Sequence, residues 1–254
     1  MTNLSVNLNK IAWLRNARPL DYPSVLLAAQ TAIEHGAQGI TVHPRPDERH
    51  IRQSDVLDLA DLLTDWSAIE FNIEGNPFEG HYLELVEKVR PVQCTLVPDA
   101  VDAATSNSGW KLSQKSLLTE LAGIIHQLHS LGCRVSLFMD AGSPELEIVE
   151  GLGADRIEIY TEPWASAFGR PEAEAQLALC KATLDQATEL GLVVNAGHDL
   201  SRQNLPAFLT ALPAIAEVSI GHALVADAVF MGLAGSVESY LQICKNPESF
   251  VDPA

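Results

Sequence analysis

Histidine and glutamate side chains stand at or near the ends of several apolar segments of this 254-residue chain, notably at His43, Glu74, Glu158 and His198. Imidazole and carboxyl groups exchange protons near neutral pH when their surroundings tune them, so the set predicts acid–base catalysis. Some of these residues also have a structural explanation, since His43 can bond a loop carbonyl and Glu74 can bond a helix start. His222, after the last apolar segment, can likewise cap the last helix. Glu158 is harder to explain structurally, because an inward carboxyl is costly unless it is paired or functional.

Residues 41–53, TVHPRPDERHIRQ, combine two histidines and three arginines with one Asp and one Glu. Two prolines stiffen the segment, which suits a loop that holds its side chains at fixed positions. Arginine is preferred for bidentate phosphate contacts, so Arg45 and its neighbours indicate an anion site. A solvated surface loop is the alternative.

The dipeptide Gly-His occurs twice after apolar runs, in NAGHD at 195–199 and in SIGHA at 219–223. Glycine lets the backbone approach a ligand, and a helix N-terminus offers free N–H groups to an anion. The two copies therefore predict two parts of one phosphate site. His43, His50, Glu74 and His198 are also suitable metal ligands, but their spacing matches no compact metal motif. We therefore expect no metal.

Apolar, β-branched segments alternate with stretches of helical periodicity along the whole chain, which is typical of buried parallel strands and their crossover helices. Glycine precedes four of the strands, at positions that suit the left-handed end of a helix. The eight expected strands are 4–9, 39–44, 68–74, 93–98, 134–140, 156–162, 192–198 and 217–222.

Eight such repeats in one chain of this length predict an α/β fold, a (β/α)8 TIM barrel formed by a single domain, 1–254, with an additional short helix after strand 8. A doubly wound sheet is the alternative, but its first turn usually carries glycines, and NLNKIAWLRNAR at 7–18 has none. Ser143 and Pro144 read as the N-cap and first residue of one helix. Residues 99–112 lack periodicity and are expected to form a mobile lid over the site, with a passive surface loop as the alternative.

Acidic residues outnumber basic ones by 33 to 16, for a net charge of −17, which argues against nucleic-acid binding. No apolar run reaches the ~18 residues of a membrane span, and the N-terminus lacks a secretory pattern. The four cysteines, none in a CxxC pair, read as reduced thiols of a cytoplasmic protein.

Seven blocks, in order, resemble the signature segments of the pyridoxine 5′-phosphate synthase family: VNLNKIAWLRNAR, GITVHPRPDERHI, FNIEGNP, LVPD…TSNSGW, RIEIYTEP, VNAGHDL and VSIGHAL. They extend from residue 6 to about 225, so they cover nearly the whole chain. The resemblance implies a transferase-class synthase of vitamin B6 biosynthesis. Such an enzyme condenses 1-deoxy-D-xylulose 5-phosphate with 3-amino-2-oxopropyl phosphate, needs no cofactor, and assembles as a homo-octamer.

The resemblance also implies roles for individual residues. His43 and Glu74 correspond to the first and second proton acceptors, His198 to the proton donor, and Glu158 to an auxiliary proton-transfer group. Arg45 and His50 correspond to the pair that grips the deoxyxylulose phosphate. The remaining expected substrate contacts are Asn7, Asn9, Lys10, Arg18, Thr105, Asp199, Gly221 and His222.

Three positions depart from the family pattern. Asn9-Lys10 stands where the pattern has Asp-His, and Asp199 stands where it has Gly. A carboxylate about 4 Å from a phosphate costs several kcal/mol at an effective dielectric constant near 20. We therefore expect the Asp199 side chain to turn outward, or to bond Lys10 or a nearby N–H. Two other functions stay open: another phosphate-handling barrel enzyme, and a non-catalytic phosphate-binding homologue.

Overall fold

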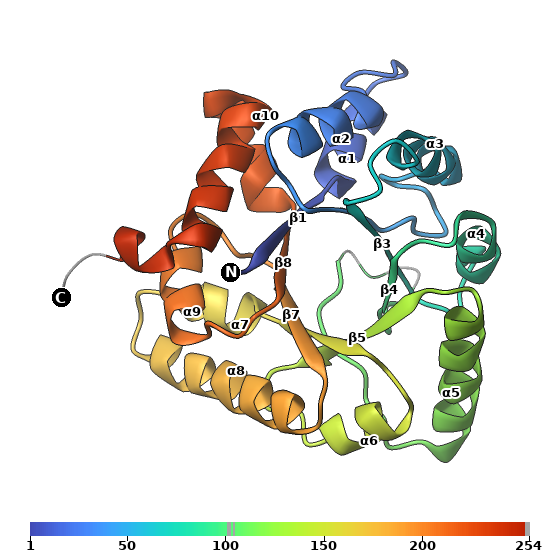
Figure 1. Ribbon diagram of the computed structural model, residues 1–254, viewed down its shortest axis with the longest axis vertical. Coiled ribbons are helices and arrows are strands. Elements are labelled where there is room, and N and C mark those ends of the chain that lie inside the picture. Colours follow the sequence, from blue (N-terminus) through green and yellow to red (C-terminus); the bar gives the residue numbers. More distant parts are fainter. Residues whose placement is uncertain (101–102, 104, 252–254) are drawn as a thin grey trace.

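The computed structural model describes residues 1–100, 103 and 105–251. Eight parallel strands pair in sequence order and close into a barrel, with β8 hydrogen-bonded to β1 (Figure 1). Each expected strand segment overlaps one of them, and β1 and β3 each extend one residue beyond it, so the (β/α)8 prediction is confirmed. The strands are β1 Asn3–Asn7, β2 Gly39–Val42, β3 Glu70–Gly75, β4 Gln93–Leu96, β5 Arg134–Asp140, β6 Arg156–Tyr160, β7 Val193–Gly197 and β8 Glu217–Ile220.

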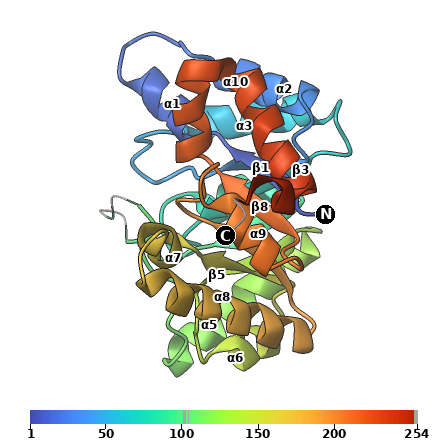
Figure 2. The ribbon, with the colours of Figure 1, turned by 90° about the vertical axis from the view of Figure 1, so that its left-hand side faces the viewer.

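Helices surround the barrel on its outer side (Figures 1 and 2). The glycines expected to end helices do so with positive φ, for example +98° at Gly36 and +80° at Gly191. The helices are α1 Asn9–Asn16, α2 Val25–Glu34, α3 Gln53–Leu63, α4 Tyr82–Val89, α5 Lys115–Ser130, α6 Leu146–Gly151, α7 Glu162–Ala167, α8 Glu172–Glu189, α9 Leu205–Ala211, α10 His222–Lys245 and the 3₁₀ turn η1 Pro247–Phe250.

The start predicted for α6 is wrong by two residues. The helix begins at Leu146 with Glu145 as its N-cap, whereas the sequence pattern indicated Ser143. The Glu145 carboxylate accepts a hydrogen bond from the Leu112 N–H at 2.8 Å, and this bond ties residue 145 to the segment before α5. A long-range contact therefore outweighs the local capping signal.

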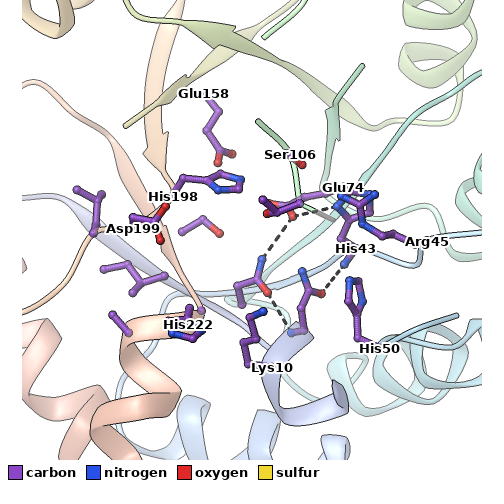
Figure 3. Close-up of a pocket in the computed structure, with 18 residues that line it drawn as sticks. Lys10, His43, Arg45, His50, Glu74, Ser106, Glu158, His198, Asp199 and His222 are labelled. Carbon is purple, nitrogen blue, oxygen red and sulfur yellow. Dashed lines mark hydrogen bonds and ion pairs between the residues drawn. The ribbon is translucent and has the colours of Figure 1, made fainter. Parts of the chain in front are cut away.

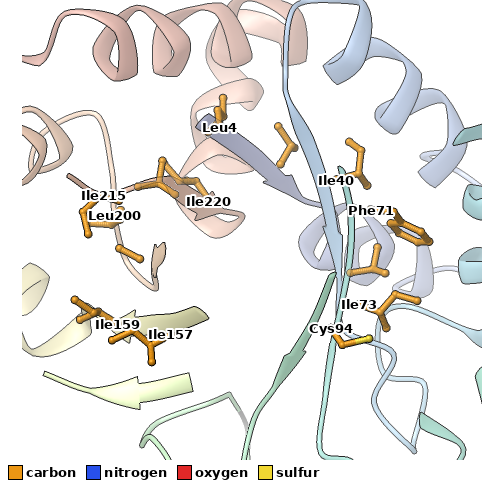
Figure 4. Close-up of a cluster of buried hydrophobic side chains, with 14 of the residues drawn as sticks. Leu4, Ile40, Phe71, Ile73, Cys94, Ile157, Ile159, Leu200, Ile215 and Ile220 are labelled. Carbon is orange, nitrogen blue, oxygen red and sulfur yellow. The ribbon is translucent and has the colours of Figure 1, made fainter. Parts of the chain in front are cut away.

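Two layers with different chemistry meet at the strands. Side chains such as Leu4, Ile40 and Ile157 point outward and form the apolar core with the helices (Figure 4). The opposite faces of the first four strands carry a hydrogen-bonded polar row inside the barrel, in which Ser5 bonds Thr41 at 2.7 Å. In that row Thr95 donates to Asn72, which donates to Thr41. Many barrels fill this space with branched apolar side chains, so the interior is unusually polar.

Helix α10 follows β8 and has a break at Gly232, where φ is +75° and ψ is +155°. The break separates a first segment from the terminal one, which agrees with the expected short helix after strand 8. By length and composition α10 is apolar enough to cross a membrane, but in this fold it packs against β1 and α2.

The expected lid, 99–112, is irregular, and its residues 101, 102 and 104 lie outside the described part of the chain. Its second half is attached to the barrel. The Trp110 N–H donates to the Phe138 carbonyl at 3.0 Å, and the Trp110 indole N–H donates to the Leu96 carbonyl at 2.8 Å. Whether the first half moves stays a prediction.

Candidate active site

A cavity of about 320 Å³ opens at the carboxyl ends of the strands (Figure 3). Thirteen of the fourteen site residues expected from the sequence line it, together with five others. The expected ones are Asn7, Asn9, Lys10, His43, Arg45, His50, Glu74, Thr105, Glu158, His198, Asp199, Gly221 and His222. The others are Ser106, Leu200, Ser219, Ile220 and Ala223. Arg18 is exposed just after α1 and lies outside the lining.

His43 and Glu74 face each other across the ends of β2 and β3, with 3.9 Å between His43 Nδ1 and Glu74 Oε2. Two asparagines hold this pair. The Asn7 side-chain amide donates to Glu74 Oε2 at 3.4 Å. The side-chain oxygen of Asn9 accepts a hydrogen bond from the backbone N–H of His43 at 2.9 Å. The second bond needs only an oxygen acceptor, so the change from Asp to Asn at position 9 preserves it.

Burial sets the protonation of this pair. Burial, with a smaller contribution from the nearby Asp99 carboxylate, raises the pKa of Glu74 to about 8. Burial and the positive charge of Arg45 lower the pKa of His43 well below its usual value. The pair therefore holds its exchangeable proton on the carboxyl group at neutral pH, and the imidazole is a neutral base.

Glu158 and His198 form a second acid–base group on the other side of the cavity (Figure 3). A β-carbon at Gly197 would collide with the Glu158 carboxylate, so the carboxyl group occupies space that only a glycine leaves free. Burial raises the pKa of Glu158 well above its usual value, with added repulsion from Glu74. This group is therefore a neutral acid.

His198 is held by its backbone and by aromatic rings. Its φ is +83°, and the Thr161 hydroxyl donates to the carbonyls of Gly197 and His198. Its ring lies 5.2 Å from the Tyr160 ring and 5.3 Å from the Phe138 ring, between centroids. Burial lowers the pKa of His198 against the opposing effect of Asp199, so its imidazole is neutral at pH 7.

Arg45 and His50 stand together on the loop that follows β2. The Arg45 guanidinium donates to Asp99 at 2.6 Å and to the Ala103 carbonyl at 3.1 Å. Ser106 donates to the same Asp99 oxygen at 2.5 Å. Sequence reasoning missed Asp99 and Ser106 as site residues, although both belong to the block LVPD…TSNSGW that carried part of the family resemblance.

A second feature suited to an anion lies at Gly221 and His222, where β8 ends and α10 begins. Gly221 is the N-cap of the helix and lines the cavity with His222 and Ala223, so the first N–H groups of α10, which lack helical partners, belong to residues of the cavity wall. The position is tight, because a β-carbon at Gly221 would lie 3.1 Å from the β-carbon of Asn7. The helix dipole adds positive potential here.

Lys10 and Asp199 line the cavity but are not bonded to each other. Lys10 Nζ lies 4.3 Å from the centre of the Trp13 ring, and burial lowers its pKa, with Asp199 acting in the opposite direction. The Asp199 side chain is exposed at the rim, and its backbone carbonyl accepts the Asn204 amide at 3.0 Å. An exposed rim position therefore accommodates the extra carboxylate.

Within residues 1–100, 103 and 105–251, no group of three or more His, Cys, Asp or Glu side chains is arranged to hold a metal ion. What the cavity offers is two acid–base groups, one on each side. Hydrogen-bond donors suited to an anion lie at the loop after β2 and at the start of α10. This arrangement suits proton transfers on a phosphorylated substrate held between them.

Comparison with known proteins gives strong matches across the chain. The family described as "Pyridoxal phosphate biosynthesis protein PdxJ" matches residues 4–246. A pyridoxine 5′-phosphate synthase of Albidiferax ferrireducens is 52% identical over 247 residues, covering 95% of this chain and 96% of the relative. One of Porphyromonas gingivalis is 50% identical over 240 residues, covering 94% of this chain and 98% of the relative.

Solved structures resemble this chain in fold alone. Phosphoribosyl anthranilate isomerase of Thermotoga maritima has a TM-score of 0.59 at 11% identity, covering 96% of this chain and 99% of that chain. 3-Hexulose-6-phosphate synthase of Salmonella typhimurium has a TM-score of 0.61 at 12% identity, covering 96% and 99%. Identities this low carry no information about activity.

Proposed function

The chain belongs to the PdxJ family of pyridoxal phosphate biosynthesis proteins and is a synthase of that family, and on this premise we propose that it makes pyridoxine 5′-phosphate by condensing two phosphorylated substrates. These are 1-deoxy-D-xylulose 5-phosphate and 3-amino-2-oxopropyl phosphate, and inorganic phosphate and water are released. The supporting observation is a single cavity that places two acid–base groups, His43–Glu74 and Glu158–His198, between two anion-binding features.

The two substrates use opposite sides of the cavity in this proposal. Arg45 and His50 bind the phosphate of deoxyxylulose phosphate, with Lys10 and Thr105 beside them. The start of α10, at Gly221 and His222, binds the phosphate of the amino ketone. Both ends combine hydrogen-bond donors with positive potential, which phosphate requires.

Proton transfers follow from the resting protonation of the two groups. An amine and a ketone form an imine when the carbonyl oxygen gains protons, the nitrogen loses them, and water departs. Neutral His43 accepts the first proton, whereas Glu74 accepts the second after its own proton has passed to solvent. Neutral Glu158 gives its proton to the neutral His198 imidazole, which then donates a proton to the leaving oxygen, and solvent returns a proton to Glu158.

We further propose that the enzyme is cytoplasmic and forms a homo-octamer. Exposed apolar side chains support self-association, since Phe230 on α10 is 92% exposed and Tyr22 after α1 is 78% exposed. Helices α1 and α10 lie side by side (Figure 2). Light scattering should give a mass near eight chains, and Phe230→Ser should lower it; an unchanged mass would contradict the role of this surface. Arg18, between α1 and Tyr22, is exposed and does not line the cavity, and its expected substrate contact stays a prediction.

The decisive experiment supplies both substrates and follows pyridoxine 5′-phosphate by absorbance and free phosphate by a colorimetric assay. Wild type should form both products, and His43→Ala and Glu74→Gln should lose turnover by about a hundredfold or more. His81→Ala and Glu84→Gln are matched controls, because His81, just before α4, and Glu84, on α4, are both exposed. Tight substrate binding without turnover in wild type would instead support a non-catalytic homologue.

A further inference from the structure

A buried ion pair joins α1 to α3 beside the cavity but outside its lining. Arg15 is 4% exposed and Asp55 is 8% exposed. The guanidinium grips both carboxylate oxygens, with one nitrogen bonding Oδ1 and the other bonding Oδ2 at 2.9 Å. Neither side chain lines the cavity, so the role of this ion pair lies in the neighbouring groups that its two members bond.

Stabilisation of the fold does not by itself explain why this ion pair is buried. Removing two charges from water costs several kcal/mol per ion, and apolar residues of similar volume often serve a fold equally well. A bidentate pair does, however, fix the direction of every remaining N–H group on the guanidinium. The pair is therefore better explained by the geometry that it imposes on its neighbours.

Those neighbours belong to the loop that carries His50. The second guanidinium nitrogen of Arg15 and the amide of Asn16 both donate to the His50 carbonyl oxygen, at 3.1 Å and 2.8 Å. Asp55 also accepts the N–H of Arg52 at 2.8 Å. The loop is thus held on both sides of Ile51, which is fully buried.

The held peptide in turn sets the state of the His50 ring. A peptide unit is planar, and its C=O and N–H point in opposite directions. Fixing the His50 carbonyl therefore fixes the Ile51 N–H, which donates to His50 Nδ1 at 2.9 Å. Burial and the charge of Arg45 lower the pKa of His50 to about 4, so the ring is neutral and its one proton lies on Nε2.

We propose that Arg15, Asn16 and Asp55 form a positioning set that fixes the peptide after His50 and, through it, the orientation and tautomer of the His50 imidazole. The ring then presents Nε2–H as a fixed donor to a phosphate oxygen in the cavity. None of the three residues touches substrate. The expected effect on turnover rests on the proposed function, whereas the effect on the tautomer does not.

The first test reads the tautomer directly by solid-state NMR of protein carrying ¹⁵N-labelled histidine, with the His50 signals identified by their loss in His50→Gln. Wild type should show one neutral form with the proton on Nε2. Asn16→Asp keeps the volume but places a carboxylate against the His50 carbonyl, and should mix or reverse the tautomers. The double variant Arg15→Met, Asp55→Leu should do the same.

The second test uses kinetics with both substrates. The two variants should raise KM for deoxyxylulose phosphate about tenfold, the value of one lost hydrogen bond, with kcat and the other KM nearly unchanged. The matched control is Arg134→Met, Glu70→Leu, which removes an ion pair at the opposite end of the barrel. It should change neither the tautomer nor KM.

The outcomes separate the two proposals. An unchanged tautomer in Asn16→Asp would overturn the positioning set, and this single variant keeps the test open if the double variant does not fold. A changed tautomer with an unchanged KM would support the positioning set and would contradict the assigned contact between His50 and substrate.

Discussion

At the scale of single residues, the cavity keeps its carboxyl groups protonated and its imidazoles neutral. Carboxyl groups free in water are ionised at neutral pH, but burial keeps Glu74 and Glu158 protonated by raising the pKa of each. The imidazoles of His43 and His198 are neutral for the same reason, since burial lowers their pKa values. The cavity therefore holds neutral carboxyl groups beside neutral imidazoles.

The first prediction concerns pH. Glu74 accepts a proton only when it is ionised, and burial raises its pKa to about 8, so kcat/KM should rise with pH through that region. Asp99→Asn removes the second cause of this shift and should move the rise to lower pH by roughly one unit. Asp140→Asn, on the neighbouring strand β5, is the control. A rise that stays in place in Asp99→Asn would contradict the assignment.

The second prediction concerns the glycine beside Glu158. Gly197→Ala adds a methyl group where the Glu158 carboxylate lies, so it should lower kcat by about tenfold or more. Combined with Glu158→Asp, which withdraws the carboxyl group, the same change should cost much less. Gly123→Ala in α5 is the control, because nothing lies within 4 Å of its added carbon. Additive losses in the double variant would count against this contact.

The third prediction concerns Asp199, whose φ of +56° is left-handed. Asp199→Gly should stabilise the fold by up to about 1 kcal/mol, because glycine adopts this conformation without strain. The affinity for both substrates, measured by calorimetry, should change less than about tenfold, since the carboxylate is exposed. Arg90→Gly, with φ of +50° at the end of α4, is the control for stability. A larger gain in affinity would show that Asp199 repels phosphate.

At the scale of elements, the strands and the loops and helix starts that follow them place the groups that line the cavity. The carboxyl ends of parallel strands meet at one face of a barrel, so residues far apart in sequence converge there. Helix α10 adds its N-terminus to the same face, and its break at Gly232 lets the first segment take a direction different from the terminal one. The phosphate end of the site therefore depends on one backbone conformation.

The fourth prediction tests that conformation. Gly232 has φ of +75° and ψ of +155°, a region that is essentially restricted to glycine. Gly232→Ala should lower the free energy of unfolding by about 1–3 kcal/mol, and nothing lies within 4 Å of the added carbon, so the cost is one of backbone strain. Gly235→Ala, inside the terminal segment, should have the opposite sign, because alanine favours a regular helix. Chemical denaturation compares the two, and a shared sign would contradict the break.

At the scale of the whole molecule, the barrel interior is a polar column beneath the active site. At the end opposite the cavity, Arg156 donates to Asn195 at 3.1 Å, and Asn195 donates to Glu217 at 3.3 Å. Burial, with the nearby charge of Glu70, raises the pKa of Glu217 to about 7. Buried carboxyls of this kind make the stability of the fold depend on pH.

The fifth prediction follows from that dependence. Because the folded state raises the pKa of Glu217 to about 7, this group stabilises the fold fully at acid pH, and its contribution is lost as pH rises through that value. At pH values above 7, Glu217→Gln should therefore raise the free energy of unfolding by at most about 3 kcal/mol, and the thermal midpoint with it. Near pH 4 the substitution should have little effect. Glu84→Gln, exposed on α4, should show no such trend. An equal effect at both pH values would contradict the raised pKa.

The sequence by itself determined the barrel and most of the lining of its cavity. Strand and helix periods are local, and the rule that chemistry gathers at the carboxyl ends of strands converts them into a site. His43, Glu74 and His198 could be identified in this way. Local pattern erred at Ser143, where a bond from the distant Leu112 holds Glu145 at the helix start.

Only the tertiary structure decided which of these groups touch. The Asn9 bond to the His43 N–H, the placement of Glu158 against Gly197 and the bidentate pair of Arg15 with Asp55 all join segments more than thirty residues apart. Burial, which sets every pKa shift in the cavity, is likewise a property of the closed barrel. The periodicity of apolar residues predicts the face of an element on which a side chain lies. The distances between side chains and their desolvation depend on how those faces pack together in the barrel.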